Sequence, residues 1–274
     1  MRSYRPGRRA VVEATTETGR LFLKVVRPAA LPRMVERHAV LDGAVPTPPL
    51  LATTDDGVLV LSGLPGTPMR GLIAGNGSGL PDAAELDRVL ESLPEAAADI
   101  ATVGRGMPGD SLARVADHAA VLGMVADDLR PRLEALTAVL TGTDPGEHPE
   151  VPVHGDFYES QLLVDDGRIV GLLDVDTAGR GHWIDDWANL LAHLVLLELI
   201  LPTPATAARY RRALEAHLLR RWPAEQLRPR VAAVLVGLAT GPFRVQQARW
   251  PEGTADRLAL AEEWAGLGAE ESAR

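Results

Sequence analysis

The chain has 274 residues, a net charge of −9 and 46% hydrophobic residues, so its composition is that of a globular protein with one large or two modest domains. It has no cysteine, which excludes disulfides, thiolate metal sites and a cysteine nucleophile. Its acidic balance argues against binding to nucleic acid, because such binding depends on Lys and Arg side chains that neutralise phosphates.

The N-terminal stretch MRSYRPGRRAVVEA is basic but lacks the apolar segment of a signal peptide. The most apolar stretch, WANLLAHLVLLELILP, is too short for a membrane span and carries Asn189, His193 and Glu198. We therefore expect a buried helix there, a cytoplasmic protein and no membrane partner.

The first 66 residues predict a small β-rich region. Residues 9–26 contain two β-rich runs on either side of TTETG, which predicts a hairpin. Residues 31–42 predict a short helix, in which Pro32 is acceptable because it lies in the first turn. Residues 57–66 predict a further strand that ends at a Pro-Gly turn.

From about residue 82 the pattern becomes helical. Asp82 followed by Glu85 is typical of a capping box at a helix start. The amphipathic stretch of residues 111–140 contains Pro131, which is expected to kink or split the helix. Further helices are expected near residues 185–200, 204–221, 224–239 and 254–267.

Polar side chains cluster at the ends of a predicted hairpin in VPVHGDFYESQLLVDDGRIVGLLDVD, residues 151–176. Gly155 permits a sharp turn before Asp156, Gln161 follows five residues later, and Asp174 ends the second strand. Because a hairpin returns the chain to its starting edge, these three side chains are expected to converge. Two carboxylates and an amide oxygen suit Mg²⁺, which shares oxygen ligands with substrate phosphates.

Two other interpretations of this stretch remain open. Aspartates near strand ends are common in turns, so a purely local turn role is the simplest alternative. Zinc is less favoured than Mg²⁺, because His154 and His182 are the only nearby soft ligands.

The segment HGDFYESQLLV followed by LLDVDTAGRGHWIDDWANL resembles the aminoglycoside phosphotransferase and choline kinase superfamily, whose fold is similar to that of protein kinases. The chain departs from the usual pattern at Gln161, where Asn is common. The resemblance implies an α+β, bilobal fold. Residues 1–66 would form a truncated β-rich nucleotide-binding lobe with the hinge, and residues 67–274 a mostly helical lobe with the inserted catalytic hairpin.

The resemblance also assigns expected roles in the N-terminal region. Lys24 on a strand would hold the nucleotide phosphates, and Glu36 on the following helix would position that lysine. The carbonyl group of Ser62 and the N–H group of Leu64 would contact the adenine edge. Taken singly, Lys24 and Glu36 are better interpreted as surface charges, but their order ahead of the HGD motif favours the pair.

The implied activity is transfer of the γ-phosphoryl group of ATP, or GTP, to a hydroxyl of a sugar, amino sugar, aminoglycoside or amino alcohol. Asp156 would orient that hydroxyl, and Gln161 and Asp174 would bind Mg²⁺. Glu159, Asp185 and Glu198 are candidates to meet an amine of the substrate. The alternatives are an inactive kinase-like protein that binds a nucleotide or ligand, and a metal-dependent hydrolase using His154, Asp156, Asp174, Asp176 and His182.

Three positions have two interpretations each. Asp186 is expected to cap a helix or to support the catalytic loop, and Asp176 to touch a metal or to form a turn. His154 is expected to orient the loop rather than to act as a base.

The N-terminus is the least typical part of the pattern. No G-x-G-x-x-G motif precedes Lys24, so the turn RPGRR would have to serve as a short phosphate-facing loop. Ser3 and Tyr4 would then end a clipped first strand. Arg5, Arg8 and Arg9 are interpreted either as a lid over the phosphates or, preferably, as a solvated basic end.

Overall fold

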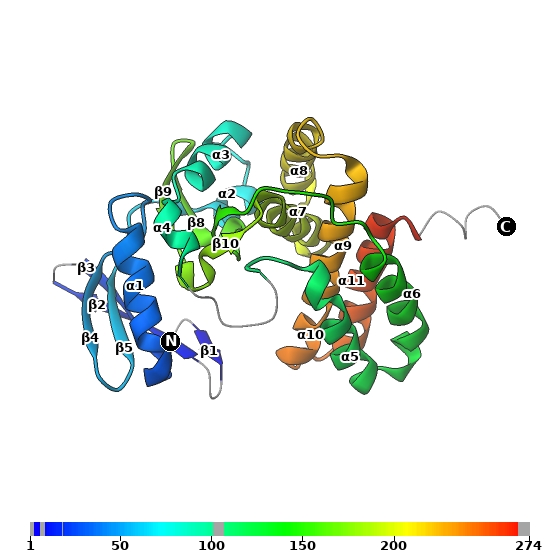
Figure 1. The fold of residues 1–274 in the computed structure, drawn as a ribbon, viewed down its shortest axis with the longest axis horizontal. Helices are drawn as coiled ribbons and strands as arrows, with labels where there is room; N and C mark the ends of the chain where they lie inside the picture. Colours follow the sequence, from blue (N-terminus) through cyan, green and yellow to red (C-terminus); the bar gives the residue numbers. More distant parts are fainter. Residues whose placement is uncertain (1–2, 6–8, 18, 101–106, 268–274) are drawn as a thin grey trace. The chain divides into compact units, whose positions relative to one another are not determined.

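The computed structural model describes residues 3–5, 9–17, 19–100 and 107–267 (Figure 1). The predicted site residue Arg8 lies outside these ranges. Spatial contacts between residues divide the chain into two compact units. The first unit comprises Met1–Thr102, Val151–Asp156 and Ser160–Arg180. The second unit comprises Val103–Glu150, Phe157–Glu159 and Gly181–Arg274.

These units group residues 67–102 and most of the 151–180 segment with the N-terminal sheet. The predicted boundary at residue 66 instead separates the residues expected to bind the nucleotide from those expected to carry the catalytic and substrate sites. The division into a lobe of residues 1–66 and a lobe of residues 67–274 stays a prediction.

The first unit contains a five-stranded antiparallel sheet with the order β1-β2-β3-β5-β4, made by β1 (Ser3–Arg5), β2 (Arg9–Thr16), β3 (Gly19–Val26), β4 (Leu50–Thr54) and β5 (Val58–Ser62). β2 and β3 form the hairpin that the sequence predicts, and β1 is the short first strand. β4 was not predicted. It lies at the sheet edge and is mostly exposed, so it lacks the alternation of buried residues by which strands are recognised.

One face of this sheet packs against helix α1 (Leu31–Leu41), which follows the short 3₁₀ turn η1 (Pro28–Ala30). Val26, Met34 and Leu59 form a small hydrophobic cluster at this contact. Lys24 pairs with Leu59 on the neighbouring strand, so its side chain lies on the same, covered face. The sheet therefore buries a lysine beside its apolar core.

The second hairpin joins β8 (Leu162–Asp165) to β9 (Arg168–Leu172), and β8 also pairs with β6 (Thr67–Pro68). Its two loop residues, Asp166 and Gly167, both have positive φ, as a type I′ turn requires. β7 (Val151–Val153) and β10 (Gly179–Gly181) form a separate pair. The hairpin predicted from the Asp-Asp-Gly sequence is therefore confirmed.

Three helices of the first unit, α2 (Met69–Ala74), α3 (Ala83–Glu91) and α4 (Glu95–Ala98), lie between the two hairpins in the chain. Asp82 caps α3 by accepting a hydrogen bond of 2.8 Å from the Glu85 amide. The Glu85 carboxylate does not complete the predicted capping box. It accepts hydrogen bonds from Arg88 and, at 2.8 Å, from the Ile169 amide of β9. This side chain therefore ties α3 to the second hairpin.

The second unit is helical and contains the 3₁₀ turns η2 (Leu112–Arg114) and η3 (Asp127–Leu129) with α5 (Val115–Val125), α6 (Arg130–Thr141), α7 (Trp183–Ile200), α8 (Ala205–Leu218), α9 (Ala224–Ala239), α10 (Gly241–Arg244) and α11 (Trp250–Ala265). Pro131 lies in the first turn of α6, so the predicted split of residues 111–140 is confirmed. Among the described residues, none of the helices has the length and hydropathy of a membrane span.

Replacing Glu85 by Ala should lower the free energy of unfolding by about 1–3 kcal/mol, because it leaves the buried Ile169 amide unpaired. Hydrogen bonds from Arg88 lower the pKa of Glu85. The stabilisation by this carboxylate is therefore present above about pH 4 and is lost as the pH falls further. Urea unfolding at pH 7 and pH 3 measures this effect. The difference in free energy of unfolding between wild type and Glu85→Ala should be smaller at pH 3 than at pH 7.

The control is Glu91→Ala, which removes an exposed carboxylate of the same helix. It should change stability by less than about 0.5 kcal/mol. A Glu85→Ala protein as stable as this control would contradict the anchoring role of Glu85.

Candidate active site

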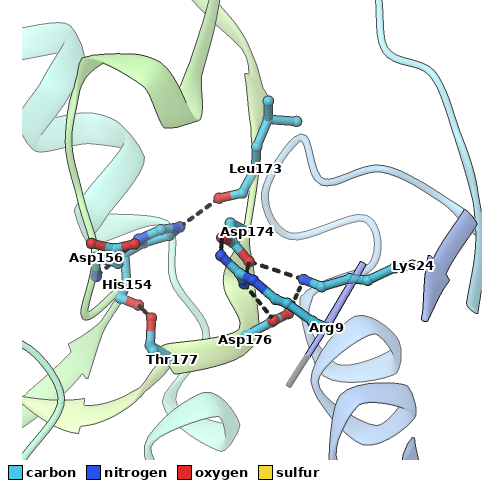
Figure 2. A network of polar contacts seen from close by, with 8 residues as sticks. All are labelled: Arg9, Lys24, His154, Asp156, Leu173, Asp174, Asp176 and Thr177. Carbon is cyan, nitrogen blue, oxygen red and sulfur yellow. Dashed lines mark hydrogen bonds and ion pairs between the residues drawn. The ribbon is translucent and has the colours of Figure 1, made fainter. Parts of the chain in front are cut away.

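Four charged side chains from two hairpins meet in the first unit, as Figure 2 shows. Lys24 Nζ lies 2.9 Å from Asp174 Oδ1 and 2.5 Å from Asp176 Oδ1. Arg9 Nη2 lies 2.9 Å from Asp174 Oδ2, and Arg9 Nη1 lies 3.3 Å from Asp176 Oδ2. Each cation therefore bridges both carboxylates. We call these four residues the charge cluster.

The strand register explains why both cations point the same way. Val11 on β2 pairs with Lys24 on β3, so their side chains share a face of the sheet. Arg9 lies two residues before Val11 and therefore shares that face too. Arg9 and Lys24 are diagonal neighbours on adjacent strands.

The carboxylates of the cluster are aimed by the chain that leaves β9. Asp174 has φ 54° and ψ 48°, a left-handed conformation that is strained for a residue with a side chain. Asp176 follows in the short 3₁₀ turn η5 (Val175–Thr177). Burial opposes ionisation of Asp174, but Lys24 and Arg9 outweigh it and hold the pKa of this carboxyl well below its usual range.

Asp156 is held in a tight loop after β7. Gly155 has φ 78°, the left-handed turn that the sequence predicts before Asp156. His154 Nε2 donates to the Leu173 carbonyl at 2.8 Å, and the Asp156 amide donates to His154 Nδ1 at 3.3 Å. These partners assign the proton to Nε2. The imidazole thereby ties the Asp156 turn to the strand end that carries Asp174. Because main-chain groups occupy both ring nitrogens, neither nitrogen is available as a base or a metal ligand.

Gln161 reaches the same strand end through the main chain. Its carbonyl accepts a hydrogen bond of 2.8 Å from the Leu173 amide, one residue before Asp174. The residue is buried, and its side-chain amide has no hydrogen-bond partner among the described residues. The unpaired amide oxygen of Gln161 and the carboxylates of Asp174 and Asp176 are ligand types that suit Mg²⁺.

This donor set leaves part of a metal's coordination to other ligands. Among the described residues, no group of three or more His, Asp or Glu side chains is placed to hold a metal ion. Mg²⁺ usually keeps waters and shares phosphate oxygens with one or two carboxylates. The residues present therefore fit a magnesium–nucleotide better than a metal held by protein alone.

The predicted pair of Lys24 with Glu36 does not form. Glu36 lies exposed on α1, and the ion-pair partners of Lys24 are Asp174 and Asp176. The packed face of α1 carries Arg37 and His38 instead, in the same helical stripe as the core residue Met34. Arg37 Nε donates to the Ala178 carbonyl at 2.8 Å, just beyond Asp176.

The predicted hinge follows β5. The Ser62 amide donates to the Pro49 carbonyl, and the Gly63 amide donates to the Arg20 carbonyl. The Leu64 amide has no hydrogen-bond partner among the described residues. This open donor suits the adenine contact expected of Leu64, and the roles of Ser62 and Leu64 stay predictions.

In the second unit, α7 holds the three residues that follow Asp156 in the chain. Asn189 Nδ2 donates to the Phe157 carbonyl at 3.2 Å. The Tyr158 and His193 rings stack with centroids 3.9 Å apart, and His193 Nδ1 lies 3.7 Å from the buried Glu159 carboxylate. These contacts fix the course of the chain directly after the candidate catalytic residue.

The acidic residues expected to meet a substrate amine are engaged within the protein. Asp185 pairs with Arg230 in a buried contact of 3.0 Å, and Glu198 pairs with Arg211. Asp186 is buried in the first turn of α7, which begins at Trp183, so it is not the helix cap. The buried Asp185 and the partly exposed Glu198 therefore already have cationic partners within the protein.

Of the two interpretations of Arg9, the preferred one, a solvated basic end, is wrong, because the guanidinium contacts Asp174 and Asp176. The alternative, a lid over the phosphates, stays a prediction. One signal was available: Arg9 precedes Val11 by two residues in a predicted hairpin that also contains Lys24, which is the spacing of side chains on one strand face.

Replacing Asp174 by Gly should give a more stable protein than replacing it by Ala, by about 1 kcal/mol. Both changes remove the carboxylate, but only Gly adopts a φ of 54° without strain. Urea unfolding of the two variants measures the difference. At Asp165, whose φ is not positive, the same pair of substitutions should show the opposite order. If the Gly variant were the more stable of the two at both positions, or the less stable at both, the proposed backbone strain at Asp174 would be contradicted.

The phosphotransferase enzyme family matches residues 4–234 of the chain. No curated protein sequence matches the chain significantly. Among solved structures, macrolide 2′-phosphotransferase MphH from Brachybacterium faecium has a TM-score of 0.52 and 21% identity, over 92% of this chain and 88% of that one.

Two further solved structures are similar. A thermostable mutant of aminoglycoside phosphotransferase APH(4)-Ia, in a ternary complex with AMP-PNP and hygromycin B, has a TM-score of 0.61 and 16% identity, over 98% of this chain and 94% of that one. The GDP and kanamycin complex of APH(2″)-IIia has a TM-score of 0.58 and 14% identity, over 97% and 92%. These similarities confirm the predicted α+β fold, and the match over residues 4–234 shows that the chain belongs to the phosphotransferase enzyme family.

Proposed function

We propose that the protein transfers the γ-phosphoryl group of ATP, or of GTP, to a hydroxyl group of a small molecule with the help of Mg²⁺. The observation that carries this proposal is the convergence of Lys24 and Asp174, whose charged atoms lie 2.9 Å apart, at the strand end to which His154 ties Asp156. A phosphate-binding lysine, a metal-binding carboxylate and a hydroxyl-orienting carboxylate are the parts that phosphoryl transfer needs.

Asp156 orients the acceptor. Its carboxylate accepts a hydrogen bond from the substrate hydroxyl and holds that oxygen in line with the γ-phosphorus. As the new O–P bond forms, the bond from phosphorus to the β–γ bridging oxygen breaks, and the electron pair leaves with the nucleoside diphosphate. The hydroxyl proton passes to Asp156. Because a carboxylate is a weak base at neutral pH, its main contribution is positioning.

Lys24 neutralises charge on the nucleotide phosphates, and Gln161 and Asp174 hold the metal. When bound, Mg²⁺ would offset the negative charge that develops on the phosphate oxygens. The main-chain groups of Ser62 and Leu64 bind the edge of the base. Glu36 is exposed, so Lys24 depends on Asp174 and Asp176 for its position.

The acceptor belongs to the class of sugars, amino sugars, aminoglycosides and amino alcohols. The structural neighbours support a bulky polar acceptor, since two of them contain hygromycin B or kanamycin. They support either nucleotide, since one contains AMP-PNP and another GDP. A metal-dependent hydrolase is disfavoured because main-chain groups occupy both ring nitrogens of His154.

A screen of such acceptors with ATP or GTP and Mg²⁺ tests the proposal. The measured signal is the release of nucleoside diphosphate. With an accepted substrate, Asp156→Asn should lower kcat by at least ~100-fold, because the amide does not accept the hydroxyl proton. The matched control is Asp165→Asn, an exposed aspartate at the end of β8, which should retain full activity.

Two results would separate this proposal from its rivals. An inactive kinase-like protein would be stabilised by magnesium–nucleotide, with no acceptor-dependent turnover in any variant. Turnover that survives Asp156→Asn unchanged would remove Asp156 from the mechanism.

The role of Gln161 predicts a graded metal effect. Gln161→Asn keeps an amide oxygen, whereas Gln161→Leu removes it at similar volume. The Mg²⁺ concentration for half-maximal activity should rise by roughly tenfold or more in the Leu variant and by less in the Asn variant. Equal Mg²⁺ dependence in all three proteins would contradict ligation by Gln161.

A further inference from the structure

We propose that Arg9 is a phosphate-binding residue that exchanges partners between the Asp174–Asp176 pair and the phosphates of a bound nucleotide. Its role would be to supply a second cation to the phosphates beside Lys24. The inference rests on the proposed function and develops the phosphate-facing alternative for Arg9 into an exchange of partners.

The position of Arg9 supports this role. Arg9 and Lys24 share one face of the β2–β3 hairpin and contact the same two carboxylates. The Arg9 guanidinium therefore contacts the candidate metal-binding carboxylate directly, at 2.9 Å.

Charge balance requires an exchange. In the charge cluster, two cations neutralise two carboxylates. One Mg²⁺ carries the same charge as the two side chains together, so a metal at Asp174 makes Arg9 and Lys24 surplus there. The freed cations then face the phosphates that the metal brings. Lys24 must make this exchange if it holds phosphates, and Arg9 contacts the same carboxylate oxygens.

The hydrogen bonding of Arg9 is also incomplete. Arg9 Nε is buried and has no hydrogen-bond partner among the described residues, whereas both Nη atoms are engaged. A buried unpaired donor is rare and costly in proteins. The guanidinium fork matches a phosphate group with two parallel hydrogen bonds, and Nε can take part in such a pair. Phosphate therefore offers Arg9 a partner for the donor that the carboxylates leave unpaired.

The sequence around Arg9 agrees with this role. The basic stretch RPGRR, which is expected to serve as a short phosphate-facing loop, ends at Arg9. Arg9 is the first residue of β2, so its cation would follow that loop directly in the chain.

The test compares Arg9→Gln and Arg9→Lys with wild type in binding experiments rather than in turnover. Calorimetry measures the dissociation constants of adenosine and guanosine, and of ADP and GDP with Mg²⁺. Electron paramagnetic resonance measures binding of Mn²⁺ alone. The control is Arg212→Gln, which removes an exposed cation on α8. Thermal unfolding monitored by circular dichroism compares the folded states of all four proteins.

Arg9→Gln should weaken binding of the nucleoside diphosphate by roughly tenfold to a hundredfold and leave nucleoside binding unchanged. The same variant should bind Mn²⁺ alone more tightly, by a factor of about three or more, because Asp174 loses a competing cation. Arg9→Lys should lie between wild type and Arg9→Gln, since it keeps the charge without the fork. Arg212→Gln should match wild type in every measurement.

If Arg9→Gln binds Mn²⁺ more tightly and the nucleoside diphosphate more weakly, Arg9 has the proposed role. A purely structural role would weaken the binding of both ligands. Equal loss of nucleoside and diphosphate binding, unchanged diphosphate binding, or weaker Mn²⁺ binding would each overturn the role of Arg9. In these cases the wild-type protein still binds nucleotide, and the proposed function stands. Failure of wild type to bind either diphosphate would overturn the proposed function, and this inference with it.

Discussion

The candidate active site depends on one electrostatic constraint: buried charges must be paired. Lys24 has an exposed fraction of only 6%, and leaving its ammonium group unpaired there would cost several kcal/mol. Asp174 and Asp176 supply the opposite charge from a hairpin some 150 residues away in the chain. The need to pair this lysine therefore joins the N-terminal sheet to the second hairpin within one compact unit.

Local backbone geometry then aims each group at the site. A type I′ turn returns β9 beside β8, a left-handed glycine turns the chain before Asp156, and a left-handed Asp174 ends the second hairpin. His154 joins two of these features through its ring nitrogens. Asp174 combines backbone strain with ion pairing, so the cluster offsets part of the strain that presents this carboxylate to a ligand.

The sequence and the structure agree where the determinants are local. The Asp-Asp-Gly turn, the Asp82 cap and the helix break at Pro131 depend on residues close in the chain, and all three are present. The expected Lys24–Glu36 pair depended on how α1 is rotated against the sheet. Packing of Met34 and its helical neighbours decided that rotation, and it turned Glu36 to solvent and Arg37 inward.

The sequence by itself determined the elements and the residue types of the candidate site, because turn geometry, strand alternation and the spacing of Asp156, Gln161 and Asp174 are short-range properties. It also determined the family, since those spacings are specific. Only the tertiary structure decided the partners: Lys24 with two aspartates, Arg9 with the same two, and Glu85 with the Ile169 amide. Partner choice among charged groups is a competition between many similar contacts, and burial and register, which emerge when distant segments pack, decide the outcome.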